Sequence, residues 1–250
     1  MALPQLQQLV HYQTGLNQIM SQSRIIVALD YPDADSALAF ADQVTPAACR
    51  LKIGKELFTA EGPNLVRKLV DRGFDIFLDL KFHDIPNTVN KAIAAASRLG
   101  VWMVNVHAMG GEEMMLEARE AIDATAERKP LLIAVSILTS SGESQLKQIG
   151  MSGSVEENVI RLTGLALKSG VDGMVCSARE AQALRQQFGQ QPLLVTPGIR
   201  PSGASSDDQK RIMTPQQAIE AGSSYLVIGR PITQHQSPLQ ELQRINQSLQ

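Results

Sequence analysis

The chain has 250 residues, of which 44% are hydrophobic and 19% are charged, so it has enough apolar side chains for a full globular core. This composition excludes disordered, collagen-like and disulfide-rich chains. There are 23 Lys and Arg residues against 25 Asp and Glu residues, giving a formal net charge of −2. With no basic excess, we expect neither a nucleic-acid partner nor an anionic membrane surface as partner.

The cysteine content favours a reducing compartment. Cys49 and Cys176 lie far apart and belong to no CxxC motif or Cys/His cluster, so the sequence predicts neither a zinc site nor a disulfide framework. No stretch is long and apolar enough to span a bilayer, and the N-terminus lacks the basic segment and apolar run of a signal peptide. We therefore expect a cytoplasmic protein.

The chain divides into an extension and one domain. Residues 1–23 are expected to form an N-terminal extension, either a short amphipathic helix based on Leu3, Leu6 and Val10 or a frayed tail. Residues 24–250 contain no linker, charge block or change of composition, which predicts a single domain.

From residue 25 onward, short β-branched runs alternate eight times with longer helical patterns. Eight strand–helix units in about 225 residues predict an α/β fold, a (β/α)8 TIM barrel, rather than an open sheet. No GxGxxG follows a strand, so a dinucleotide site has no support. The predicted strands are 25–30, 50–54, 74–81, 103–108, 131–138, 173–177, 193–199 and 225–230. The predicted helices are 36–43, 62–72, 86–99, 112–127, 155–169, 178–188, 214–221 and 238–249, with Gly73, Gly100, Gly170 and Gly222 as helix stops.

Charged residues gather where the first three strands end. Asp30 ends strand one, Lys52 lies in strand two, and Asp79, Lys81 and then Asp84 follow in strand three and its loop. Active sites of such barrels lie at the C-terminal ends of the strands, and residues two apart on a strand share a face. The pattern therefore predicts an Asp/Lys network at the barrel mouth, in which a protonated Lys could deliver a proton to a developing carbanion.

Structural roles are alternatives for single members of this group. Asp84 precedes Ile85 and Pro86, so it could be the N-cap of the next helix. Asp30 could cap the next segment or form a salt bridge. A single Lys in a strand is usually a surface side chain with a buried stem. These alternatives do not explain the convergence of four charges on one end of the barrel.

A second group of residues follows strands seven and eight, whose loops frequently bind phosphate in this fold. Pro197 and Arg200 follow strand seven, and Gly229 and Arg230 follow strand eight. A glycine backbone and a guanidinium are suitable hydrogen-bond donors to phosphate, although a tight turn at Gly229 and a surface ion pair of Arg230 would explain these two residues nearly as well. The polar segment 201–211 is predicted to be a lid, and its Gln209 could donate to a phosphate.

Other polar residues near strand ends give weaker indications. His107 follows Asn105 by two positions, so both could face the mouth, but no third metal ligand accompanies His107 and we predict no metal site. His83 is expected to position the Asp84 loop. The loop after strand five, which contains Thr139, could supply hydroxyl or backbone contacts to a ligand.

Five segments together resemble one enzyme family. FLDLKFHDIPNT over 77–88 contains an Asp-x-Lys-x-x-Asp signature, and this segment is similar to orotidine 5'-phosphate decarboxylases. The resemblance continues in VALD over 27–30, LKIGK over 51–55, VTPGIR over 195–200 and VIGRP over 227–231. It covers the chain from about residue 24 onward and is similar to the bacterial branch of the family.

The resemblance implies cofactor-free decarboxylation of orotidine 5'-monophosphate to uridine 5'-monophosphate in pyrimidine biosynthesis. By position, Lys81 stabilises and protonates the C6 carbanion. Asp79 lies beside the substrate carboxylate and either repels it or preorganises Lys81. Lys52 holds the aspartates and touches the ribose, while Asp30 accepts from a ribose hydroxyl. The remaining substrate-binding positions are Ile85, Thr139 near the base, Pro197, and Arg200, Gln209, Gly229 and Arg230 near the phosphate.

The resemblance also implies a homodimer, in which Asp84 and Thr88 reach the site of the partner subunit. Three other functions remain as alternatives. A magnesium-dependent decarboxylase or aldolase of a sugar phosphate shares the strand-three motif but needs a carboxylate where Lys52 stands. A Schiff-base aldolase needs an unprotonated lysine. A non-catalytic phosphate-binding protein on a retired barrel would be expected to have lost part of the charge network.

Overall fold

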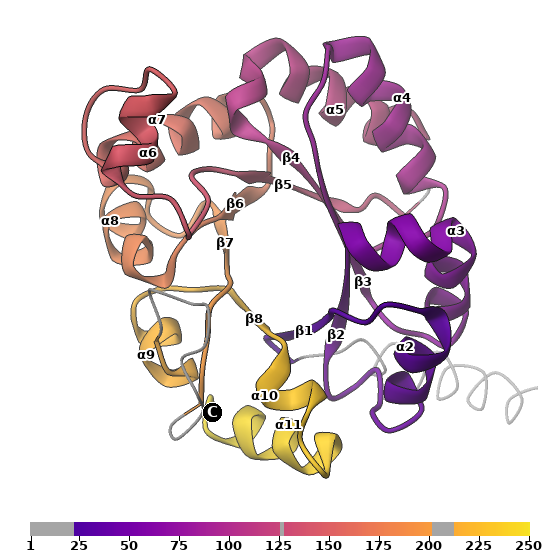
Figure 1. Ribbon diagram of the computed structural model, residues 1–250. Coiled ribbons are helices and arrows are strands. Elements are labelled where there is room, and N and C mark those ends of the chain that lie inside the picture. Colours follow the sequence, from indigo (N-terminus) through magenta and orange to yellow (C-terminus); the bar gives the residue numbers. More distant parts are fainter. Residues whose placement is uncertain (1–22, 126–127, 202–212) are drawn as a thin grey trace, which may run out of the picture.

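The computed structural model describes residues 23–125, 128–201 and 213–250, so the predicted extension lies almost entirely outside the described residues. Eight parallel strands pair in chain order, and β8 pairs with β1 to close a barrel (Figure 1). The predicted (β/α)8 fold is confirmed. The strands are β1 (Ile25–Leu29), β2 (Arg50–Gly54), β3 (Ile76–Phe82), β4 (Met103–His107), β5 (Leu131–Val135), β6 (Gly173–Val175), β7 (Leu193–Thr196) and β8 (Tyr225–Ile228).

Helices surround the barrel, and one of them is much longer than expected, while the other predicted helices differ from their predicted ranges by at most two residues at either end. The predicted helix 62–72 is the second half of a longer one, because Gly62 (φ 64°) bends a helix that already begins at Lys55. Three short helices, η1, α6 and α10, were not predicted. The helices are α2 (Ala34–Ala41), α3 (Lys55–Asp71), α4 (Pro86–Ser97), η1 (Ala108–Gly110), α5 (Gly111–Thr125), α6 (Glu143–Gln148), α7 (Val155–Lys168), α8 (Ala178–Phe188), α9 (Pro215–Glu220), α10 (Arg230–Thr233) and α11 (Pro238–Gln247).

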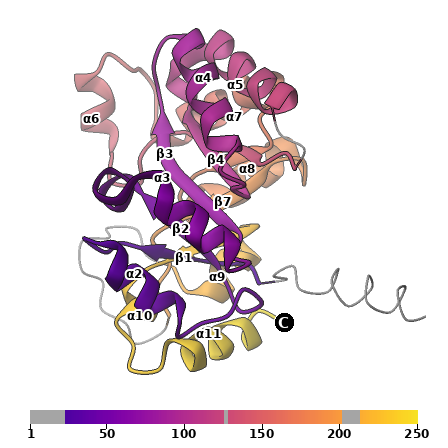
Figure 2. The same ribbon diagram turned by 90° about the vertical axis from the view of Figure 1, so that its right-hand side faces the viewer.

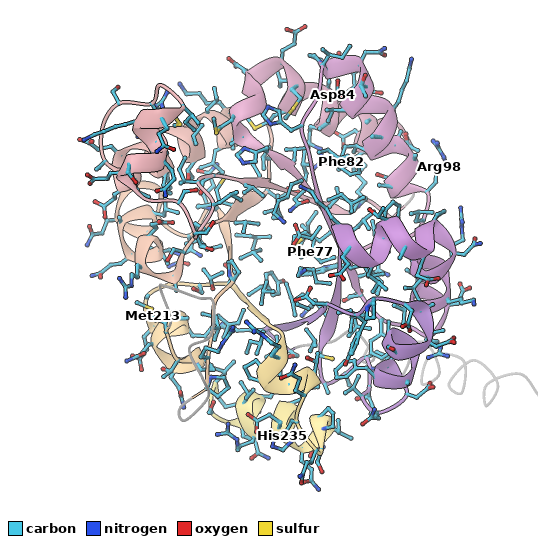
Figure 3. The ribbon with its side chains drawn as sticks, in the orientation of Figure 1. Phe77, Phe82, Asp84, Arg98, Met213 and His235 are labelled. Atoms are coloured by element: carbon cyan, nitrogen blue, oxygen red, sulfur yellow. The ribbon has the colours of Figure 1, made fainter. Side chains whose placement is uncertain are left out.

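The core has two layers, as expected when alternate residues of each strand face opposite sides. One apolar cluster fills the barrel interior and includes Phe77, Met103 and Ile133. Figure 3 shows Phe77 close to the centre of the ring. The other, larger cluster lies between the strands and the helices and includes Leu51 and Leu78. The apolar side chains fill the interior of the barrel, so the charged residues lie above this packing, at the C-terminal ends of the strands.

The two ends of the barrel differ. The segments that follow β5 and β8, including α6 and α10, lie at one end, and the C-terminus lies at the other (Figure 2). Helix-ending glycines turn the chain back toward the next strand; Gly73 and Gly222, for example, have φ values of 85° and 109°. Among the described residues, no helix has the length and apolar character needed to cross a membrane.

Candidate active site

Four charged side chains, from β2, β3 and the residue directly after β1, come together at the mouth. The Lys81 Nζ atom lies 2.6 Å from Asp79 Oδ1. The Lys52 Nζ atom lies 3.4 Å from Asp79 Oδ2 and 3.6 Å from Asp30 Oδ1, so it stands between two carboxylates. The strand register explains the arrangement, because Gly54 pairs with Asp79 and Lys52 pairs with Ala28. Cations and carboxylates therefore alternate along the inner wall.

Asp79 is the centre of this network. Burial raises its pKa, but the charges of Lys52 and Lys81 and the hydrogen bonds from Lys81 and Asn105 outweigh burial and hold the pKa below its usual range. Asp79 is therefore ionised at neutral pH. Its side chain is 13% exposed, against 65% for Asp30, so the charge is fixed in a poorly hydrated place where it acts strongly on its neighbours.

The backbone of Lys81 has an unusual conformation. Its φ is 53°, and among the described non-glycine residues it alone has a positive φ. The pairing of β3 with β4 is irregular here, moving from Leu78 opposite Val104 to Phe82 opposite Val106. Such a conformation costs about 1 kcal/mol or more in a residue with a Cβ atom and is retained where the surroundings enforce it. The irregularity aims the Lys81 side chain at Asp79.

Asn105 is a site residue that the sequence analysis expected to face the mouth but to which it assigned no role. It is fully buried on β4, its Oδ1 accepts the Lys81 N–H at 2.8 Å, and its Nδ2 donates to Asp79 Oδ1 at 2.7 Å. The available signal was a polar amide inside the apolar run of β4. A buried amide needs partners, and charged residues on the neighbouring strand are suitable ones.

A cavity of about 270 Å³ opens beside the network. Lys52, Asp79 and Lys81 form its charged wall, and Thr139 and Pro197 lie on its lining. The rest of the lining is mostly apolar, as in sites that hold a planar ring by contact and a few polar groups. The apolar and remaining lining residues are Phe77, Val135, Ile137, Leu138, Ser140, Val175 and Val227.

The loop after β3 does not join the network within one chain. Asp84, Ile85 and Thr88 are exposed, with Ile85 65% exposed, and Figure 3 shows Asp84 near α4 and away from the centre of the ring. The alternative interpretation of Asp84 as a helix cap is wrong, because α4 has Ile85 at its N-cap and Asp84 Oδ1 instead accepts the N–H of Ile85. The alternative cap role of Asp30 is also wrong, because Asp33 caps α2.

The predicted phosphate group is partly described. Gly229 precedes α10, and a Cβ atom built on it would lie 3.6 Å from Asp30 Oδ2, which places the start of α10 beside the network. Arg230 is the first residue of α10 and is partly exposed. Arg200 is 8% exposed and follows the bridge between Ile199 and Met213. Gln209 and nearly all of the predicted lid lie outside the described residues.

His83 and His107 stack, with ring centroids 5.4 Å apart. Burial, followed by the charges of His83, Lys55 and Lys81, lowers the pKa of His107 to about 4. The described ranges contain no group of three or more His, Cys, Asp or Glu side chains arranged to hold a metal ion. The contact with His107 links the Asp84 loop to β4.

The depressed pKa of His107 predicts a loss of stability in acid. Between about pH 6.5 and pH 4 the unfolded chain binds a proton at this ring and the folded chain does not, so the free energy of unfolding falls as pH drops through this window. Because the ring is only partly buried, we expect a loss of about 1 to 2 kcal/mol, less than the full shift would give. Urea unfolding at the two ends of the window should show a smaller loss in His107→Gln. His235→Gln, at an exposed histidine, serves as control, and equal losses in all three proteins would contradict the prediction.

The known proteins to which this chain is similar include several that carry the same enzyme name. The orotidine 5'-phosphate decarboxylase of Pseudoalteromonas translucida (strain TAC 125) is 57% identical over 227 residues, which cover 91% of this chain and 97% of that protein. The enzyme of the same name from Escherichia coli (strain K12 / DH10B) is 57% identical over 234 residues, covering 94% and 96%. The crystal structure of the Lactobacillus acidophilus orotidine 5'-phosphate decarboxylase is similar with a TM-score of 0.81, at 36% identity over 90% of this chain and 98% of that one.

One family description covers nearly all of the barrel. Residues 23–245 match the "Orotidine 5'-phosphate decarboxylase / HUMPS family". The match includes every strand and both groups of residues at the mouth. From this match and the identities above, we conclude that the chain belongs to the orotidine 5'-phosphate decarboxylase / HUMPS family.

Proposed function

We propose that this protein converts orotidine 5'-monophosphate to uridine 5'-monophosphate and CO2, a step of pyrimidine biosynthesis, without a cofactor. The observation that carries the proposal is the contact of 2.6 Å between Lys81 Nζ and Asp79 Oδ1 on the wall of a cavity with a mostly apolar lining. The names of the relatives support the substrate. Fixed charges in a poorly hydrated place are what a reaction through an unstabilised carbanion needs.

The reaction breaks the bond between C6 and the carboxylate. CO2 leaves, and the electron pair stays on C6 in the plane of the ring, where the ring cannot delocalise it. The Lys81 ammonium stabilises this pair and transfers a proton to C6, and the resulting amine regains a proton from water. Asp79 holds the ammonium in place and lies beside the departing carboxylate. Because folding has already fixed these charges in position, they need no rearrangement during the reaction.

The remaining candidates bind the rest of the substrate. In this proposal Thr139 and Pro197, which line the cavity, contact the base. Lys52 and Asp30 contact the ribose hydroxyls. The phosphate is held by a further group, comprising the Gly229 backbone, Arg230, Arg200 and Gln209.

The position of Lys52 distinguishes this proposal from a magnesium-dependent reaction on a sugar phosphate. The Lys52 ammonium already occupies the space between Asp30 and Asp79, at 3.6 and 3.4 Å from their oxygens. A divalent cation prefers several carboxylate oxygens and would be repelled by the ammonium. These residues therefore fit a cofactor-free site better than a magnesium site.

An absorbance assay with orotidine 5'-monophosphate tests the proposal. We expect the orotate chromophore to disappear with formation of uridine 5'-monophosphate, at the same rate with and without EDTA. Activity that EDTA abolishes and Mg²⁺ restores would favour the sugar-phosphate alternative, and borohydride trapping of a substrate would favour the Schiff-base alternative. Nucleotide binding by folded protein with no turnover would favour the non-catalytic alternative.

We also propose a homodimer in which the loop after β3 completes the site of the partner subunit. The support is the exposure of Asp84, Ile85 and Thr88 in a single chain, together with the resemblance. An apolar side chain as exposed as Ile85 is suited to burial in an interface. The acidic Asp84 would then join the Asp/Lys network from outside the chain.

Mixing two inactive variants tests this arrangement. Lys81→Ala keeps Asp84, and Asp84→Ala keeps Lys81, so a mixed dimer has one site with both groups intact. After subunit exchange we expect about a quarter of the wild-type activity, because about half of the dimers are mixed and each has one complete site. No recovery after exchange, or a monomer by light scattering, would contradict the shared site.

We further propose that the enzyme works in the cytoplasm. Cys49 and Cys176 are unpaired and buried, and burial raises the pKa of Cys49 to about 12, so neither thiol is prepared for disulfide formation. Cell fractionation should recover the protein with the cytosol, and recovery from the medium or the membrane fraction would contradict the proposal.

A further inference from the structure

Asn105 occupies a place that no substrate-binding role explains. It is fully buried in β4, opposite Ile133 of β5, and its two hydrogen bonds both go to β3. One is to the Lys81 backbone, and the other is to the Asp79 carboxylate. A single side chain thus contacts both partners of the shortest ion pair in the proposed site.

The hydrogen bond from the Lys81 N–H to Asn105 replaces a backbone hydrogen bond between β3 and β4. Between Leu78 and Phe82 the β3 strand advances four residues while β4 advances only two, from Val104 to Val106. Ordinary ladder pairing is interrupted over this stretch. The Asn105 Oδ1 atom takes the place of a backbone acceptor for the Lys81 N–H, at 2.8 Å, where φ is 53°.

The second bond fixes the carboxylate. Asn105 Nδ2 donates to Asp79 Oδ1 at 2.7 Å, and Lys81 Nζ contacts the same oxygen at 2.6 Å. The orientation of the amide is determined by its partners, because an N–H requires an acceptor and a carboxylate requires a donor. Neither an ionised aspartate nor an apolar side chain can supply both groups.

We propose that Asn105 is a positioning residue, which sets the place of the Lys81 ammonium by holding the Lys81 backbone and the Asp79 carboxylate at once. The proposal rests on the function proposed above. Asn105 touches no reacting atom in it. Its effect is on how the charged pair is aimed, and misplacement of a catalytic group lowers turnover more than substrate binding.

Asn105→Asp is the most informative variant, because it preserves the size of the side chain. At neutral pH the introduced carboxylate can still accept the Lys81 N–H, but its second oxygen faces Asp79 Oδ1 without a proton between them. The charged groups facing this position are Asp79 and Lys81 on β3, with Lys52 behind Asp79 on β2. Protonation of the pair at lower pH restores a donor toward Asp79.

We expect kcat of Asn105→Asp to fall about 10- to 100-fold at neutral pH, with KM changed much less. The ratio of variant to wild-type kcat should rise as the pH is lowered from about 8 to about 5. Asn105→Ala should lose kcat without this recovery in acid. Asn90→Asp is the matched control, because the Asn90 amide donates to Glu117 outside the site. The proposal would be overturned if the ratio of variant to wild-type kcat did not depend on pH, or if KM changed by as large a factor as kcat.

A crystal structure of Asn105→Ala tests the same inference without any assay. We expect φ of Lys81 to leave the positive region and the contact between Lys81 Nζ and Asp79 Oδ1 to lengthen. An unchanged backbone and contact would overturn the positioning role. If Asn105→Ala does not fold, the structure of Asn105→Asp at neutral pH answers the question by the second measure alone: its carboxylate can still accept the Lys81 N–H, but it no longer donates to Asp79, so the contact between Lys81 Nζ and Asp79 Oδ1 should shift. Absence of turnover in the wild-type protein would instead overturn the proposed function and leave this structural test valid.

Discussion

Lys81→Ala is expected to reduce turnover of orotidine 5'-monophosphate by about 10⁴-fold or more while the barrel remains folded. The variant loses both the cation that stabilises the electron pair on C6 and the acid that protonates C6. Asp79 would keep its contacts with Lys52 and Asn105, at 3.4 and 2.7 Å, so its charge stays partly compensated. Single-turnover kinetics at saturating substrate would measure the chemical step directly.

Lys68→Ala provides the matched control, because Lys68 is an exposed lysine on α3. It should behave as the wild type, and circular dichroism should show the same barrel in both variants. Binding of uridine 5'-monophosphate should survive in Lys81→Ala, since the substitution leaves Gly229 and Arg230, which are proposed to hold the phosphate, unchanged. Substantial residual turnover in folded Lys81→Ala would refute the role of this lysine as proton donor.

The barrel was predictable because its signals are local and repeated. Each strand is a short apolar run, and glycines such as Gly100 and Gly170 adopt the positive φ expected of helix ends, at 77° and 75°. The errors lie where local signals conflict with tertiary structure. Gly62 and Pro63 are typical of a helix start, yet in the structure they lie at a bend within α3. The four-residue helix α10 is too short to have a periodicity.

The candidate site was predictable only in part, for a related reason. The rule that active sites lie at the C-terminal strand ends identified Asp30, Lys52, Asp79 and Lys81 as neighbours, and the structure brings them together. The role of Asn105 depends on the irregular register between β3 and β4, which is a property of two strands and not of either sequence alone. The positive φ of Lys81 is equally invisible in the sequence, because a lysine gives no signal for that conformation.

Arg230→Ala is expected to lower kcat/KM by about 2 to 5 kcal/mol of transition-state binding, although it removes a group far from C6 in the substrate. Arg230 opens α10 immediately after Gly229, which borders Asp30 of the charge network. A guanidinium there can hold a phosphate by two parallel hydrogen bonds. The binding energy of the phosphate can then hold the reacting ring against Lys81, so that kcat falls together with the affinity.

The loss in Arg230→Ala should depend on the phosphate itself. Uridine 5'-monophosphate should bind the variant more weakly than the wild type, whereas uridine should bind both alike, because the missing interaction is absent from the nucleoside. Arg98→Ala, at an exposed arginine next to α4 (Figure 3), is the control and should change neither kcat/KM nor the affinity for uridine 5'-monophosphate. An equal weakening for nucleotide and nucleoside would mean that Arg230 shapes the site rather than binding the phosphate, and an unchanged kcat/KM would remove it from the site altogether.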